Sequence, residues 1–194
     1  YDAYQTLTAG NQEIGARFGE SVAVSQDGTT IVVGANRATD STTTTAGQSY
    51  VFKLIGTTWT LTQVIQGGAV ETDAQFGVSV AVSETGTDIV VGAPNQTVNF
   101  ANSGAVHHFK SQSATFTGDG STTQFTTTFD IQHDQLLRVT AGTTVYAVSD
   151  GSTTPNYSTD GTTNQVTLST APASGDTVTI QQYQREKIIA PLSI

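Results

Sequence analysis

The chain of 194 residues contains no cysteine and no methionine, and only 12% of its residues are charged. Without cysteine it can form neither a disulfide framework nor a thiolate metal site. Its 7 lysine and arginine residues are scattered singly against 16 acidic residues, for a formal net charge of −9, which argues against binding to nucleic acid or to anionic membranes. No apolar run reaches the roughly 18 residues of a membrane-spanning helix, so we expect no membrane insertion. Because the first residue is Tyr1 and no methionine follows, we expect a processed chain or a segment of a longer one.

Threonine and glycine are abundant instead, with 36 and 19 residues respectively. Threonine is β-branched and suits a half-exposed pleated surface, whereas a helical protein would be rich in alanine, leucine, glutamate and lysine. The composition therefore predicts an all-β protein. Low charge together with abundant threonine, serine and glycine is also typical of a rigid extracellular or virion surface.

One block of the chain occurs twice. Residues 18–35 return as residues 76–93, and 58 positions separate Phe18 from Phe76 as well as Gly34 from Gly92, so the block contains no insertion. Further on, residues 47–53 match residues 104–110 at a spacing of 57. Repeats of this kind bury their apolar faces by stacking on a neighbouring unit.

Each copy predicts two strands joined by a short turn. A Ser-Val-Ala-Val-Ser strand leads through a glycine-containing turn to an apolar triplet at residues 31–33 or 89–91. A continuous triplet of this kind predicts a strand covered on both faces. The loops that follow, residues 36–46 and 94–103, are not repeated, and loops at one edge of a repeat scaffold commonly bind partners.

The order of Phe-Gly, Ser-Val-Ala and Gly-Ala in both copies resembles the FG-GAP repeat, the blade unit of integrin-type β-propellers, over roughly residues 4–112. The second copy also carries the closing proline of that motif, Pro94, where the first copy has Asn36. Many members of the family hold calcium in a loop of alternating Asp and Asn. Here residues 25–28 and 83–86 offer far fewer than the about six to eight oxygen ligands that calcium takes, so we expect no metal and no cofactor.

Two blades do not close a propeller, which typically needs about four to eight. The second repeat offers no fourth strand, because the sequence changes character after Gln112, whereas residues 4–8 alternate and look like a spare strand. Either several chains pool their blades, three chains giving about six, with residues 4–8 completing a neighbour's second blade, or the chain is part of a longer single-chain propeller. The predicted propeller-like domain is 1–112, with repeats at about 18–75 and 76–112, and with 1–17 as a strand of a preceding or neighbouring blade.

A second module starts at Ser113. Short alternating strands with turn signals about every 8 to 12 residues, the first around residues 118–120, predict a small antiparallel β-sandwich over residues 113–184. The strings at residues 116–125 and 168–178 resemble modules of bacteriophage tail fibres and related virion appendages. We expect residues 185–194 to be a linker or an assembly tail.

The sequence carries no nucleophile elbow, phosphate loop, metalloprotease motif or EF-hand loop, so we expect no enzymatic activity and no catalytic residues. His107 and His108 are adjacent on an expected strand, which predicts one inward and one solvent-facing side chain rather than a shared metal. His133 and Asp134 are interpreted as a surface turn, although a general-base pair is conceivable.

Five further side chains have a functional and a structural interpretation. Asp27, Glu84 and Asp88 could begin a metal site, but each is most simply a turn or strand-end residue. Trp59 and Tyr50 could stack on a sugar, but their size is more typical of packing between blades. The sequence identifies no ligand-binding residue.

Together these patterns predict a structural or attachment component of a phage virion, located in the tail or an appendage. It would be part of a trimeric tail fibre that contributes to host-surface binding or appendage assembly, with other virion proteins and a host glycan or protein as partners. One alternative is an extracellular or cell-surface bacterial adhesin with a carbohydrate-binding propeller. Another is a nozzle, collar or capsid decoration protein.

Overall fold

The computed structural model describes residues 4–10, 13–39, 45–67, 71–98, 100–131, 137–148, 156–160 and 162–185. These residues form strands and loops without any helix, so the all-β prediction is confirmed. Among them, no helix could cross a membrane. The chain divides into two compact units, Tyr1–Lys110 with Arg185–Ile194, and Ser111–Gln184.

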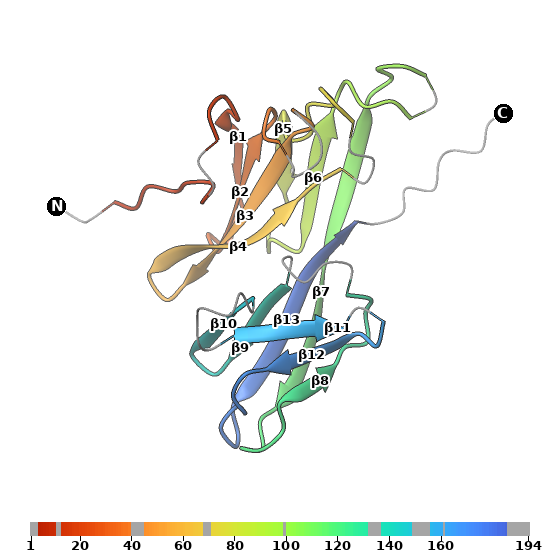
Figure 1. Ribbon diagram of the computed structural model, residues 1–194. Coiled ribbons are helices and arrows are strands. Elements are labelled where there is room, and N and C mark those ends of the chain that lie inside the picture. Colours follow the sequence, from red (N-terminus) through yellow and green to blue (C-terminus); the bar gives the residue numbers. More distant parts are fainter. Residues whose placement is uncertain are drawn as a thin grey trace. The chain divides into compact units, whose positions relative to one another are not determined.

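The first repeat forms a complete four-stranded antiparallel blade (Figure 1). Its strands follow one another in chain order: β1 (Phe18–Val24), β2 (Thr30–Ala35), β3 (Gln48–Ile55) and β4 (Thr58–Ile65). The predicted turn between β1 and β2 is present, closed by the Gly28 amide donating to the Ser25 carbonyl at 2.9 Å. The pairing of β1 with β2 is irregular between Phe18 and Ser21, where the Phe-Gly pair precedes the regular ladder.

The second repeat gives three strands in the same antiparallel order. They are β5 (Ser79–Val82), β6 (Asp88–Ala93) and β7 (Ala105–Thr117). The first unit contains β7 only up to Lys110, and the rest of this strand belongs to the second unit. The prediction that both apolar triplets are covered on both faces holds for β2, where Val32 is fully buried and Ile31 partly so. It is wrong for β6, where Val90 is 39% exposed. The second blade covers Val32 of the first blade, but no described residue covers Val90 of the second blade in the same way.

The prediction that residues 4–8 are a strand of a preceding or neighbouring blade stays a prediction, because one chain offers no such blade. These residues extend along the first blade without joining a ladder. The Gln5 side chain instead donates to the Trp59 carbonyl and accepts from the Trp59 amide, both at 2.7 Å. Leu7 packs on the buried cluster of the first blade that includes Tyr50 and Phe52.

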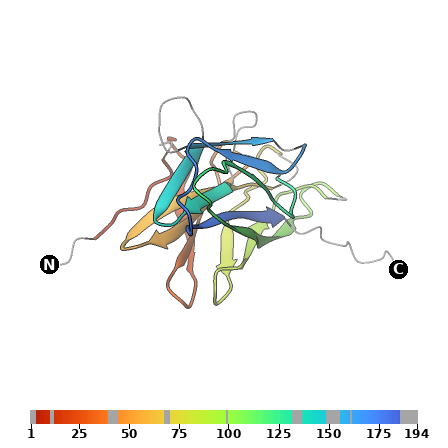
Figure 2. The same cartoon turned by 90° about the horizontal axis from the view of Figure 1, so that it is seen from below.

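The second unit is a curled sheet whose hydrogen-bonded order is β7, β13, β9, β10, β11, β12, β8. The strands not yet given are β8 (Gln124–Thr126), β9 (Leu137–Ala141), β10 (Thr144–Val148), β11 (Asn156–Asp160), β12 (Gln165–Leu168) and β13 (Thr177–Arg185). Viewed from below, β11 and β12 lie on the opposite side of this unit from β13 (Figure 2). The two layers expected of a sandwich are joined by a short parallel pair, β10 with β11, which the sequence did not predict.

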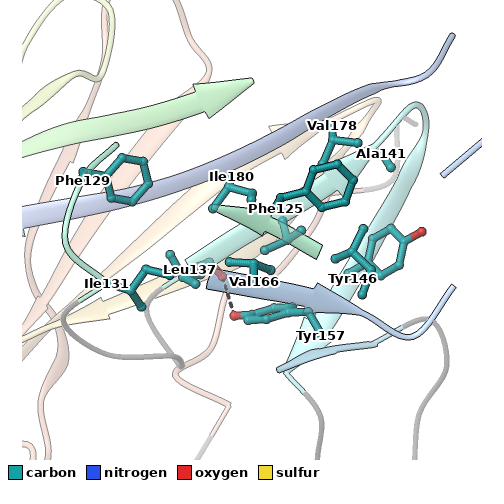
Figure 3. Packing of buried hydrophobic residues seen from close by; sticks show 12 residues of the cluster. Phe125, Phe129, Ile131, Leu137, Ala141, Tyr146, Tyr157, Val166, Val178 and Ile180 are labelled. Atoms are coloured by element: carbon teal, nitrogen blue, oxygen red, sulfur yellow. Dashed lines mark hydrogen bonds between the residues drawn. The ribbon is translucent and has the colours of Figure 1, made fainter. Parts of the chain in front are cut away.

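Alternation of apolar and polar residues directs one row of side chains from each layer into a shared core (Figure 3). Val139 and Ile180 come from one layer and Val166 from the other, and all three are fully buried. Each such side chain stabilises the fold by about 1.5–3 kcal/mol through burial. Tyr157 brings a polar group into this core, and its hydroxyl donates to the Leu137 carbonyl at 3.0 Å.

Candidate interaction surface

The second blade covers one face of the first blade. We call this the front face of the first blade: Ser21, Val32, Gly34, Ser49 and Val51, which alternation places on one side of β1, β2 and β3. Val32, Ser49 and Val51 are fully buried. The stacking predicted from the repeat is therefore present within the first unit.

The Phe-Gly pair of the second repeat makes the closest contact with this face. The Ser21 hydroxyl donates to the Gly77 carbonyl at 2.8 Å, and the Phe76 amide donates to the Ala46 carbonyl at 3.0 Å. A Cβ added at Gly34 would overlap the Gly77 carbonyl. Glycine at both positions therefore allows backbone to meet backbone between the blades.

The turns of the two blades also touch. The Asp27 amide donates to the Glu84 carbonyl at 3.1 Å, and the two turns lie side by side in Figure 2. Lys53 donates to the Thr30 hydroxyl at 2.7 Å and to the Gly86 carbonyl at 3.4 Å. The turn of the second blade is thus held at the end of the first blade's front face.

The acidic residues singled out from the sequence act in turns and at strand ends. Asp27 accepts hydrogen bonds from the Ser25 hydroxyl and the Thr29 amide, which hold the pKa of its carboxyl below the usual value. Among the described residues, no three histidine or acidic side chains gather into a group that could hold a metal ion. The turn interpretation of Asp27 agrees with these contacts.

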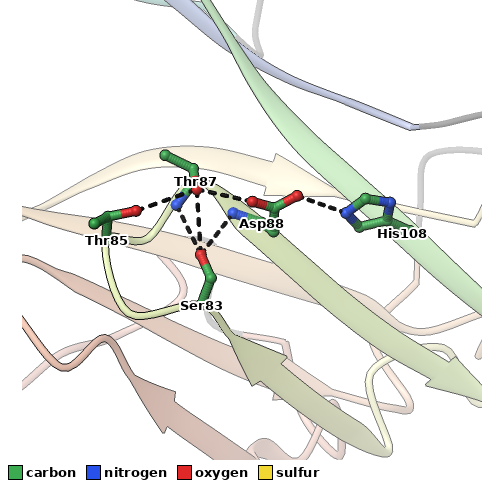
Figure 4. A network of polar contacts seen from close by, with 5 residues as sticks. All are labelled: Ser83, Thr85, Thr87, Asp88 and His108. Atoms are coloured by element: carbon green, nitrogen blue, oxygen red, sulfur yellow. Dashed lines mark hydrogen bonds and ion pairs between the residues drawn. The ribbon is translucent and has the colours of Figure 1, made fainter.

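The matching turn of the second blade forms a hydroxyl network that ends on a histidine (Figure 4). The Ser83 hydroxyl accepts from the amides of Thr87 and Asp88, and the Thr87 hydroxyl donates to Asp88 at 2.8 Å. Asp88 also lies 2.8 Å from His108 Nε2. The bonds from Thr87 and then His108 lower the pKa of the Asp88 carboxyl.

The adjacent histidines point to opposite faces, as the alternation predicts. His107 is 6% exposed, lies 2.5 Å from Gln96 through its Nε2, and meets the Phe76 ring edge-on at 5.4 Å. Burial, reinforced by the positive charge of Arg185, lowers the pKa of His107. His108 is half-buried beside Asp88, so the two rings share no ligand.

Neither aromatic candidate for sugar stacking forms an open platform. Tyr50 is 2% exposed, packs edge-on against Phe18 at 5.3 Å and donates to Gln48 at 2.8 Å. Trp59 packs against the same cluster. That cluster lies on the side of the first blade opposite the front face, so in this chain the two aromatics do not pack between the two blades. His133 and Asp134 lie outside the described residues.

The unrepeated loops are held at their bases by a contact that the sequence analysis missed. Glu13 accepts from the Thr39 amide at 2.9 Å, and Glu71, 58 residues later, accepts from the Thr97 amide at 2.7 Å. The signal was present, because both partners of the bond recur at the spacing of the repeat. The second loop carries two exposed apolar side chains, Phe100 at 79% and Val98 at 59%.

The FG-GAP repeat family matches residues 1–52 and 59–109, which is more than half of the chain. The chain belongs to the FG-GAP repeat family. The match begins at Tyr1 and again at Trp59, so each FG-GAP unit includes the segment that precedes its Phe-Gly pair. No curated protein matches the chain.

Proposed function

We propose that this FG-GAP protein is a non-enzymatic structural or attachment component of a phage virion, part of a trimeric tail fibre that aids host-surface binding or appendage assembly. The virion assignment is supported by the resemblance of residues 113–184 to tail-fibre modules. The attachment role is supported by the loop at residues 94–103. Glu71 accepts a hydrogen bond from the Thr97 amide in this loop, and the Phe100 side chain of the loop is 79% exposed. This exposed, anchored aromatic side chain carries the proposal.

An anchored loop suits weak surface binding for a physical reason. Because the Glu71 bond to the Thr97 amide already restricts the loop, less conformational entropy is lost when a ligand contacts Phe100 or Val98. A trimer displays the loop three times, and linked copies raise the overall affinity through effective concentration without any new contact.

Two measurements test this function. Mass spectrometry of purified phage particles should detect the chain, and the purified chain should compete with those particles for adsorption to host cells. Phe100→Ser should weaken the competition, whereas Val145→Ser, which removes an exposed apolar side chain from the second unit, should not. Particles that lack the chain would refute the virion assignment. Equal competition by both variants would refute the role of the loop.

The second candidate function is that of an extracellular bacterial adhesin that uses the same anchored loop to bind carbohydrate or protein. It predicts recovery of the chain from the cell envelope or the medium of uninfected bacteria. The third candidate function is that of a nozzle, collar or capsid decoration protein. In that case the chain would be present in phage particles, but substitutions in the loop would leave adsorption to host cells unchanged.

A further inference from the structure

The second blade has a front face equivalent to that of the first blade, but no described residue covers it. The matching positions are Ser79, Val90, Gly92, Val106 and His108, which we call the front face of the second blade, and the pairing of β5, β6 and β7 places them on one side. Val32 is fully buried on the first front face, whereas its counterpart Val90 is 39% exposed. Val106, the counterpart of the buried Ser49, is 57% exposed.

The first blade carries the matching half of this contact. Gly77, which docks on the first front face, has a φ of 91°, and Gly19, its counterpart 58 residues earlier, has a φ of 94°. A Cβ added at Gly77 would lie 2.6 Å from the Gln48 carbonyl oxygen and 2.9 Å from Ser49 Oγ. At Gly19 it would meet no described atom within 4 Å. The two glycines therefore share a backbone conformation, but Gly77 contacts a neighbouring blade and Gly19 contacts none of the described residues.

The turns and the surrounding side chains show the same asymmetry. The Gly86 turn lies against Thr30 and Lys53, whereas a Cβ at Gly28 would meet no described atom within 4 Å. Beside Gly28, Val22 and Val24 are 62% and 60% exposed. One chain thus holds an open receiving face at one end of its blade pair and an open docking edge at the other.

We propose that a second copy of this chain docks its Phe18–Gly19 pair and its Gly28 turn on the front face of the second blade, head to tail. The Ser79 hydroxyl donates to the copy's Gly19 carbonyl, as Ser21 does to Gly77. Lys110, the counterpart of Lys53, reaches the copy's turn. The contact reproduces one that the chain already makes within itself, and this is why a second copy is the occupant.

A head-to-tail contact uses two different surfaces, so repeated copies form a closed ring if the rotation closes, or an open filament if it does not. Three chains would give about six blades, within the usual range for a propeller. The inference deepens the oligomeric part of the proposed function and rests on it. Val106 and Val90 would become buried, and Val22 and Val24 partly buried, as their counterparts Val80 and Val82 are. Removal of this apolar surface from water stabilises the contact.

Analytical ultracentrifugation of the purified 194-residue chain tests the proposal. The unaltered chain should form an oligomer. Gly92→Ala places a methyl group where the copy's Gly19 carbonyl docks, and Val106→Glu places a charge on the same face, so each should raise the dissociation constant at least about tenfold. Val145→Glu, which introduces a charge on the second unit, should assemble as the unaltered chain does.

A mixing experiment tests the head-to-tail geometry. Val106→Glu blocks the receiving face and Val24→Glu blocks the docking edge, so each variant alone should be monomeric. Mixed in equal amounts, they should form a dimer and nothing larger, because each pair retains one intact face and one intact edge. Far-ultraviolet circular dichroism should show that both variants keep their strands.

The outcomes separate the two proposals. A monomeric unaltered chain would refute both the oligomer and this surface. An oligomer that both Gly92→Ala and Val106→Glu leave intact would refute this surface and leave the oligomeric function standing. Two monomeric variants that fail to form a dimer on mixing would refute the head-to-tail contact.

Discussion

Two glycines at equivalent positions of the repeat allow the contact between the blades to be measured. Gly34 lies on the covered front face of the first blade, and Gly92 lies on the open front face of the second. A Cβ at either position would crowd the hydroxyl of the neighbouring serine, Ser21 or Ser79. Only at Gly34 would it also overlap the Gly77 carbonyl. The difference between Gly34→Ala and Gly92→Ala therefore isolates the stacking of one blade on the other.

The magnitude follows from what must move. The Gly77 carbonyl is backbone, and its residue is fixed by its own amide, which donates to the Gly92 carbonyl at 3.0 Å. Overpacking of this kind costs about 1–3 kcal/mol. Separation of the blades would also lose the hydrogen bond from Ser21, which contributes about 1 kcal/mol. We expect Gly34→Ala to lower the free energy of unfolding by about 2–4 kcal/mol more than Gly92→Ala does.

Urea unfolding followed by tryptophan fluorescence measures this difference. The single tryptophan, Trp59, lies on β4 of the first blade and reports on the first unit. The measurement belongs at a protein concentration low enough to keep the chain monomeric, so that assembly does not contribute to the stability of either variant. Free energies of unfolding that agree within about 0.5 kcal/mol would refute the stacking of the second blade on the first front face.

Three further predictions concern single side chains. Tyr157→Phe removes the hydroxyl that donates to the buried Leu137 carbonyl, so it should lower the free energy of unfolding by about 1–3 kcal/mol, as measured by thermal unfolding. The control is Tyr146→Phe, whose hydrogen bond is longer. If Tyr157→Phe destabilised the protein no more than Tyr146→Phe, the prediction would be contradicted. His107 is held neutral by burial, so the first unit should lose stability as pH falls below the unfolded value of about 6.5, and His107→Gln should flatten that pH dependence in urea unfolding. Four hydrogen bonds from Ser121 and Thr122 hold the pKa of Asp119 well below its usual value. Their stabilisation of the turn should be present above about pH 4 and lost as pH falls further, seen as lower protection of the two amides from hydrogen exchange relative to their intrinsic rates, and Asp119→Asn should show low protection at every pH.

Local patterns predicted much of the first unit. The Ser-Val-Ala-Val strand and the apolar triplet appear as β1 and β2 and again as β5 and β6, because alternation and a glycine turn act within a few residues. The strand predicted at residues 4–8 belongs to a preceding or neighbouring blade, so the single chain leaves that prediction untested. Its pattern suits a ladder, but a strand also needs a partner edge, and within one chain Gln5 meets the edge of β4 only through its side chain. The anchoring of the loops by Glu13 and Glu71 was missed, because a side chain bond to a backbone amide 26 residues away leaves no local pattern.

By itself, the sequence determined that the chain is all-β and that one block of two strands occurs twice, with a glycine and an alanine after each apolar triplet. These features follow from side-chain shape and spacing. Only the tertiary structure decided which of the two equivalent front faces is covered. Val32 and Val90 occupy the same place in the repeat, and one is buried while the other is 39% exposed. The physical reason is that burial depends on a neighbouring sheet, and a neighbour is a property of position in the assembled chain and not of the residues themselves.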